Sequence, residues 1–219
     1  MPVEHRYKSN SEMLEELRPM EVTLSTTMSE RDTRQRVHEY FTVDLSGHLD
    51  NIGLTMPDQL AAGALNVWGN SLPAGALPAG AVEVGGVPFV TAGGDGSRPD
   101  NVRCAGQLLD LPPVAGSWLH VLATSERRCE EELHVHYADG AVDPEWLRVS
   151  DFWPAAAHFG EVAAARTGAM HYPHHIQGDL GGQIWATRVP ATRGGTLAAL
   201  RLPDNPALHL FALTVETVR

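Results

Sequence analysis

The segment Glu132-Leu133-His134-Val135-His136-Tyr137 decides the fold class, because polar and apolar residues alternate in it without a break. Successive side chains of a β-strand point to opposite faces of the sheet, so the alternation predicts a strand with one buried face. The residues expected in the core are Leu133, Val135 and Tyr137, and those expected on the opposite, wetter face are Glu132, His134 and His136.

The segment 207–213, ALHLFAL, predicts a second kind of strand. It is apolar on both faces apart from His209, which is typical of a central strand with protein packed above and below it. We therefore expect this strand in the middle of a sheet. Simple alternation places Leu208, Leu210 and Ala212 on one face and His209, Phe211 and Leu213 on the other.

Outward from these two segments, most of the chain beyond His38 consists of short apolar stretches separated by Gly, Pro, Asn and Asp. Such spacing predicts many strands joined by turns, and no long helical pattern interrupts them. The expected fold is all-β, a two-sheet antiparallel β-sandwich of jelly-roll-like type. The other stretches expected to be strands are EYFTVDL (39–45), ALNVW (64–68), AVEV (81–84), VPFV (87–90), WLHVLAT (118–124), WLRVSDF (146–152), EVAAAR (161–166), QIWATRV (183–189) and TLAALRL (196–202).

Residues 1–38 differ from the rest in being rich in charge and poor in glycine. Ser9 followed by Glu12 is a capping-box pattern, which predicts a short helix that Pro19 ends. We expect residues 1–38 to form an N-terminal arm or linker, helical or extended, and residues 39–219 to form the sandwich domain. The arm either moves freely or packs on the sandwich or on a second subunit of a homo-oligomer.

Charge and cysteine content exclude several classes of partner. The formal net charge is −11 without a dense basic cluster, so no nucleic-acid partner is expected. No run approaches the roughly 18 apolar residues of a membrane span, and the N-terminus does not resemble a signal peptide, so we expect no membrane partner and a cytoplasmic location. Cys104 and Cys129 are too few for a disulfide-stapled scaffold, and we expect both to be reduced.

Histidines are the most unusual feature of the composition, with eleven in 219 residues. His134 and His136 share a strand face, and imidazoles two residues apart can converge on one metal ion. His171, His174 and His175 follow in one loop, from which His174 or His175 supplies a third ligand. The pattern predicts an open site for a divalent metal such as Zn, Fe or Cu. The alternatives are surface imidazoles without a role and hydrogen bonding to a ligand.

Tryptophans and polar loop residues suggest a second candidate site. Sugars are bound by stacking on aromatic rings and by bracketing polar side chains, and Trp68 and Trp153 lie near predicted loops. Asn70, Asp100 and Asn101 are polar residues of similar loops, and the last two belong to an oxygen-rich segment able to bind Ca. The alternative is that these residues only build turns.

Two further tryptophans, Trp118 and Trp185, lie within apolar stretches. A ring in such a strand is normally packed inside the protein, so we expect both to belong to the core.

Six blocks of the chain, in order, resemble the β-sandwich accessory domains of bacterial, chiefly actinobacterial, glycoside hydrolases, over about Phe41 to Val215. The resemblance implies a jelly-roll sandwich of the galactose-binding type with a non-catalytic, carbohydrate-associated role. The chain departs from that family in carrying His134 and His136 where it has a threonine-rich face. The blocks are DNIGLT (50–55), GNSLPAGAL (69–77), GVPF (86–89), PDNV with AGQ (99–107), HYADG (136–140) and LRLPDNP with LHLFAL (200–213).

Two functional hypotheses follow from these patterns. The first is a binding protein for a small polar ligand, a carbohydrate or glycosylated metabolite. The second is a metal-dependent (His-ligated) or acid/base enzyme of a biosynthetic pathway on the same scaffold, and a purely structural role is the third reading. Since the chain has no Gly-x-Ser-x-Gly, P-loop or Cys-x-x-Cys motif, the sequence alone does not decide whether it is an enzyme.

Overall fold

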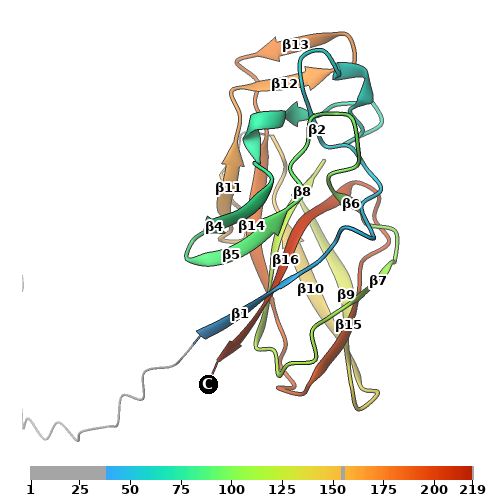
Figure 1. Cartoon of the computed structure of the whole chain (residues 1–219), viewed down its shortest axis with the longest axis vertical. Helices are drawn as coiled ribbons and strands as arrows, with labels where there is room; N and C mark the ends of the chain where they lie inside the picture. The colour runs from blue at the N-terminus through green and yellow to red at the C-terminus, as the bar shows by residue number, and fades with distance from the viewer. Residues whose placement is uncertain (1–37, 154–155, 219) are drawn as a thin grey trace, which may run out of the picture. The chain divides into compact units, whose positions relative to one another are not determined.

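The fold was obtained as a computed structural model, which describes residues 38–153 and 156–218 (Figure 1). The predicted arm and its short helix fall almost entirely outside these residues. The described elements are β-strands and two 3₁₀ turns, η1 (Leu60–Ala62) and η2 (Ala74–Ala76). The all-β prediction is therefore confirmed. No helix of the described residues is long and apolar enough to cross a membrane.

Two antiparallel sheets carry the architecture, and three strand pairs lie beside them. The larger sheet has the order β1 (His38–Val43), β16 (Leu208–Val218), β8 (Trp118–Ser125), β14 (Gln183–Pro190) and β11 (Val162–Arg166), with β6 (Val102–Arg103) also paired to β16. The smaller sheet has the order β10 (Val142–Val149), β9 (Cys129–Tyr137), β15 (Leu197–Arg201) and β7 (Leu108–Asp110). The separate pairs are β2 (Leu54–Thr55) with β3 (Leu72–Pro73), β4 (Gly80–Val84) with β5 (Val87–Thr91), and β12 (Ala169–Tyr172) with β13 (His175–Gly178).

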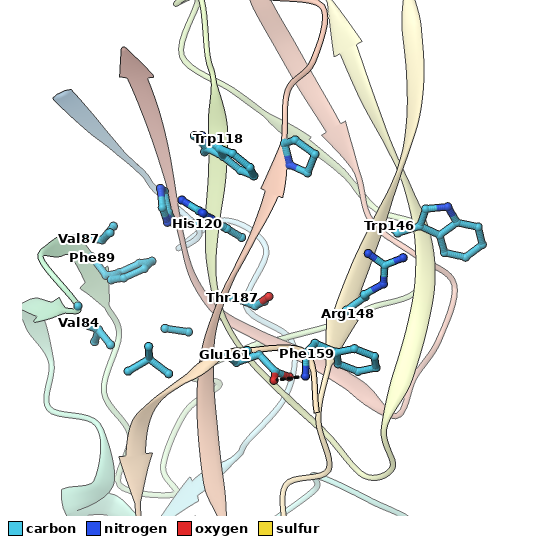
Figure 2. A pocket seen from close by; sticks show the side chains of 16 residues that line it. Val84, Val87, Phe89, Trp118, His120, Trp146, Arg148, Phe159, Glu161 and Thr187 are labelled. Atoms are coloured by element: carbon cyan, nitrogen blue, oxygen red, sulfur yellow. Dashed lines mark hydrogen bonds between the residues drawn. The ribbon is translucent and has the colours of Figure 1, made fainter. Parts of the chain in front are cut away.

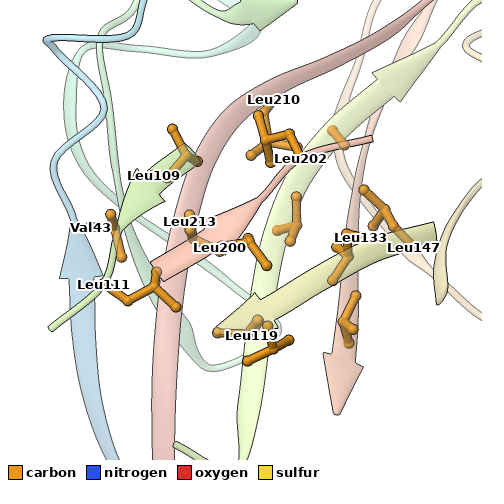
Figure 3. Close-up of a cluster of buried hydrophobic side chains, with 14 of the residues drawn as sticks. Val43, Leu109, Leu111, Leu119, Leu133, Leu147, Leu200, Leu202, Leu210 and Leu213 are labelled. Carbon is orange, nitrogen blue, oxygen red and sulfur yellow. The ribbon is translucent and has the colours of Figure 1, made fainter. Parts of the chain in front are cut away.

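The main core fills the space between the two sheets (Figure 3). Alternation in β9 directs Leu133, Val135 and Tyr137 inward, as predicted, and leaves His134 and His136 half-buried on the other face. From the larger sheet, side chains of β8 and β16 such as Leu119 and Leu213 belong to the same core. Burial of these apolar side chains supplies the main driving force for folding.

A second core covers the outer face of the larger sheet. Leu122 of β8 and Ile184 of β14 point to this face, where side chains from the loops and short strands cover them. Phe89 of β5 and Met170 of β12 are fully buried members of that cover. The centre of the larger sheet is thus buried on both faces, which explains why β8, β14 and β16 carry apolar residues on both of their faces.

Strand β16 is central, as predicted, but its faces are not those that simple alternation gives. The register with β8 shifts between Leu210 and Ala212, where a β-bulge inserts an extra residue. Beyond the bulge the alternation is inverted. Leu213 therefore joins Leu210 in the main core, whereas Ala212 packs with Phe211 in the second core.

Three other expectations can be compared with the structure. The predicted strand 64–68 is a loop that ends in a turn, and the predicted histidine loop is the hairpin of β12 and β13. Cys104 and Cys129 are free thiols, as expected, with Cys104 fully buried and Cys129 half-buried.

Candidate functional site

A groove of about 540 Å³ crosses the edge of the larger sheet at β14. Strand β11 pairs with β14 only as far as Ala186, so Thr187–Pro190 extend past the end of their neighbour. Within the part of the chain that the structure describes, no strand pairs with these four residues on that side. The open strand edge exposes backbone and side chains to a ligand-sized space.

The floor of the groove is a row of side chains on the outer face of the larger sheet. Arg188 of β14 lies directly opposite His120 of β8, and Pro190 lies opposite Trp118. Opposed residues of antiparallel strands have their Cβ atoms about 5 Å apart, so these side chains form one patch. The guanidinium carbon of Arg188 lies 4.1 Å from the ring centroid of Trp118, which fixes it by a cation–π contact.

One wall is the tip of the β4–β5 hairpin, which contributes Val84, Val87 and Phe89 to the lining. Its turn consists of Gly85 and Gly86, both with positive φ, as a two-residue hairpin turn requires. The sequence Val-Gly-Gly-Val thus positions an apolar wall beside the polar floor.

The other side of the groove lies toward the smaller sheet. Figure 2 shows Trp118 and His120 on one side of the strand that carries Thr187, and Trp146 and Arg148 on the other. Phe159 contributes a half-buried ring on the same side as Arg148. The neighbouring Glu161 is buried and accepts hydrogen bonds from the backbone N–H groups of Phe159 (2.9 Å) and Ser150 (2.6 Å), so it holds this loop in place.

His120 belongs to a hydrogen-bonded cluster with the buried Glu216 and the exposed His38. Its Nε2 lies 2.5 Å from Oε2 of Glu216, and Nδ1 of His38 lies 2.5 Å from Oε1 of the same carboxylate. Burial raises the pKa of Glu216, but the hydrogen bonds from His120 and His38 outweigh this effect and hold the pKa below its usual range. An ionised carboxylate only accepts hydrogen bonds, so His120 carries a proton on Nε2, and its neutral form has a free lone pair on Nδ1.

Replacing Glu216 by glutamine is expected to lower the free energy of unfolding by about 1–3 kcal/mol at neutral pH, because two charge-assisted hydrogen bonds are lost. A lowered carboxyl pKa stabilises the fold above the ordinary pKa of the group, and this contribution disappears as the pH falls through the lowered value. Urea unfolding should therefore give a difference from the native protein that shrinks below about pH 4. Glu83→Gln, at an exposed position of β4, is the control and should have little effect at either pH. An equal loss in the two variants would contradict this role of Glu216.

The polar residues predicted to bind ligand are buried elsewhere, and none lines the groove. Asp100 accepts hydrogen bonds from the backbone N–H groups of Gly53 and Leu54, each at 2.9 Å, and from the side chain of Asn101 at 2.7 Å. Asn101 also contacts His209 of β16, at 2.9 Å from Nδ1. These contacts tie loops to the larger sheet and account for the residues in structural terms.

Asn70, the third polar residue predicted to bind ligand, differs from Asp100 and Asn101 in having a side-chain atom without a hydrogen-bond partner among the described residues. This residue is fully buried, and its Oδ1 has no hydrogen-bond partner among the described residues. Its backbone carbonyl accepts a hydrogen bond from Leu65, which closes the loop.

The two tryptophans predicted to bind ligand, Trp68 and Trp153, do not line the groove. Trp68 is 59% exposed on a turn outside the groove, and Trp153 packs against Phe152 with ring centroids 4.4 Å apart. Trp185 is fully buried in the main core, as predicted. The core prediction for Trp118 is wrong. The second core does not extend to this end of β8, so the Trp118 side chain lines the groove.

The structure does not bring the two histidine clusters together. His134 and His136 lie on the outer face of the smaller sheet, and His134 contacts Glu132 at 2.8 Å. The other cluster lies on the β12–β13 hairpin, which pairs with neither sheet. There the buried His171 contacts Thr55 at 2.8 Å, and His174 and His175 are exposed. Among residues 38–153 and 156–218 no group of three or more His, Cys, Asp or Glu side chains is placed to hold a metal ion, so the predicted convergence is corrected.

Sequence reasoning missed the groove, although two signals for it are present. His120 and Arg188 are the ionisable residues of two strands whose other residues are apolar or uncharged, so each marks a place where the second core ends. What the sequence does not reveal is that the two residues are cross-strand neighbours.

In a comparison with known protein families, residues 39–219 match the family described as the AziU2-like beta-sandwich domain, in agreement with the fold. A comparison with curated proteins finds no match.

Proposed function

The chain belongs to the AziU2-like β-sandwich domain family, and from that premise we propose that it binds a small, carbohydrate-like polar ligand in the groove across β14. The observation that carries the proposal is the composition of the groove. Half-buried rings of Trp118 and Phe159 lie beside the hydroxyl of Thr187 and the guanidinium groups of Arg148 and Arg188. Rings that contact the apolar face of a sugar, with polar groups at its rim, are what such a ligand requires.

The size and edges of the groove support the same reading. A space of about 540 Å³ is within the usual range for small-molecule sites. Ala191 donates its N–H to the carbonyl of Ser117, the residue before β8, so strand alternation directs the backbone N–H and C=O of Arg188 to the open side. The strand edge thus offers a donor and an acceptor to a ligand with many hydroxyl groups.

Replacing Trp118 by alanine is expected to weaken ligand binding roughly tenfold or more, because a contact ring and the surface that supports Arg188 are both removed. Isothermal titration with neutral and charged monosaccharides and disaccharides would measure this, with thermal melting to confirm that the variant is folded. Phe159→Ala provides a second groove variant. Trp68→Ala is the matched control, since Trp68 is exposed and lies outside the groove. The proposal fails if no sugar binds, or if Trp68→Ala weakens binding as much as Trp118→Ala.

A second candidate function is an acid/base enzyme at the same site. The observation that favours it is the 2.5 Å contact between His120 and Glu216, because a carboxylate that fixes one ring nitrogen leaves the other to accept a proton from a ligand. The two functions differ in the fate of the ligand. NMR of a bound sugar after prolonged incubation distinguishes them, since a binding protein returns it unchanged.

A further inference from the structure

The ionisable groups that line the groove are unequal in sign. Three of them are basic in the charged form, namely His120, Arg148 and Arg188, and one is acidic, Glu161. The two oxygens of Glu161 are already engaged by backbone N–H groups, so this carboxylate faces its own loop rather than a ligand. The chain as a whole has a formal net charge of −11, which makes a basic groove an exception on its surface.

Arg188 is the basic group best placed for a ligand. In the described part of the chain it has no carboxylate partner, whereas Arg148 forms an ion pair with Glu130 at 2.9 Å. Its contact with the Trp118 ring restricts the guanidinium without using its N–H groups. A guanidinium held in this way keeps its donors for a partner and loses little conformational entropy when one binds.

We infer that the ligand of this groove carries an anionic oxygen group, a carboxylate or a phosphate, which Arg188 binds. The inference rests on the proposed function and specifies its ligand as an acidic sugar or sugar-like compound. A planar guanidinium donates two parallel hydrogen bonds to either group, and such charge-assisted pairs are among the strongest polar contacts in proteins. The rings of Trp118 and Phe159 then contact the uncharged part of the ligand, and the exposed backbone of Arg188 is within reach of its hydroxyl groups.

The test uses matched sets of ligands on the full chain. Glucose, glucuronate and glucose 6-phosphate form one set, and the galactose and mannose sets are built in the same way. Isothermal titration at low and moderate salt should show that at least one acidic member binds about 10- to 100-fold more tightly than its neutral parent, and that added salt reduces the difference. A preference for the uronate or for the phosphate identifies which anionic group the groove accepts.

Arg188→Gln should weaken binding of the acidic member much more than binding of its neutral parent, and so remove most of that preference. Arg201→Gln, an exposed arginine of the smaller sheet that does not line the groove, is the matched control and should keep the preference. If neutral and acidic sugars bind equally, or if Arg188→Gln keeps the preference, the inference is wrong while sugar binding stands. If no member of any set binds, the proposed function fails as well.

Discussion

Leu210→Ala is expected to lower the free energy of unfolding by about 2–5 kcal/mol, because it opens a cavity in the main core. Leu210 is 1% exposed and lies on β16, between β8 and the short strand β6. Its neighbours come from several strands that pair with one another, so they cannot all move inward to fill the space left by the leucine side chain. Urea unfolding followed by tryptophan fluorescence would measure the loss.

The matched control for this variant is Leu108→Ala on β7, where the leucine side chain is 52% exposed. The same chemical change at that position should alter stability by no more than about 0.5 kcal/mol. A loss below about 1 kcal/mol for Leu210→Ala would show that the core around β16 relaxes freely, contrary to its central position.

The parts of the fold that could be predicted are those that local alternation determines. Segment 132–137 has one buried face, and its pattern follows directly from the geometry of a strand. Segment 207–213 was correctly expected to be central, since both of its faces are apolar. Its bulge between Leu210 and Ala212 has no local signal, because it depends on how β16 pairs with β8.

The resemblance to sugar-associated accessory domains correctly implied a β-sandwich. Three of its blocks meet in one buried network, in which Asn51, Asn101 and His209 are joined by hydrogen bonds. Asn101, one of the predicted ligand contacts, thus connects its loop to the larger sheet. The sequence could suggest that these blocks matter, but their spatial convergence appears only in the fold.

The groove could not be predicted because it depends on where strands end. It exists because β11 stops opposite Ala186 and β10 of the other sheet lies near the exposed part of β14. Neither fact is encoded in the spacing of residues within one segment. Short local spacing also suggested that the two histidine clusters converge, but β9 belongs to the smaller sheet and the β12–β13 hairpin forms a separate strand pair.

Asp100 and His209 are expected to give opposite pH dependences of stability. Burial lowers the pKa of His209 from 6.5 to about 4, so between these values the unfolded chain binds a proton that the folded protein excludes. The stability that the neutral His209 contributes is fully present above pH 6.5, and up to about 3 kcal/mol of it is lost as the pH falls toward 4. Burial raises the pKa of Asp100 from 3.8 to about 6, against the effect of its three hydrogen-bond donors. Here the folded protein binds the extra proton, so stability rises by about 2 kcal/mol as the pH falls from 6 to 4.

In the native protein the two effects nearly cancel between pH 4 and 6, and single variants should separate them. Asp100→Asn keeps the titrating histidine and removes the aspartate, so relative to the native protein its stability should fall by about 2 kcal/mol on acidification across this window. His209→Gln leaves the aspartate alone and should become relatively more stable by a similar amount. Urea unfolding at pH 4 and pH 6 measures both differences, with Asp58→Asn at an exposed position as the control. Because Asn101 contacts both groups, the double variant tests whether they titrate independently. If the two groups titrate independently, the change in pH dependence of stability in the double variant equals the sum of the changes in the two single variants. A single variant whose stability varies with pH as that of the native protein does would contradict the assignment.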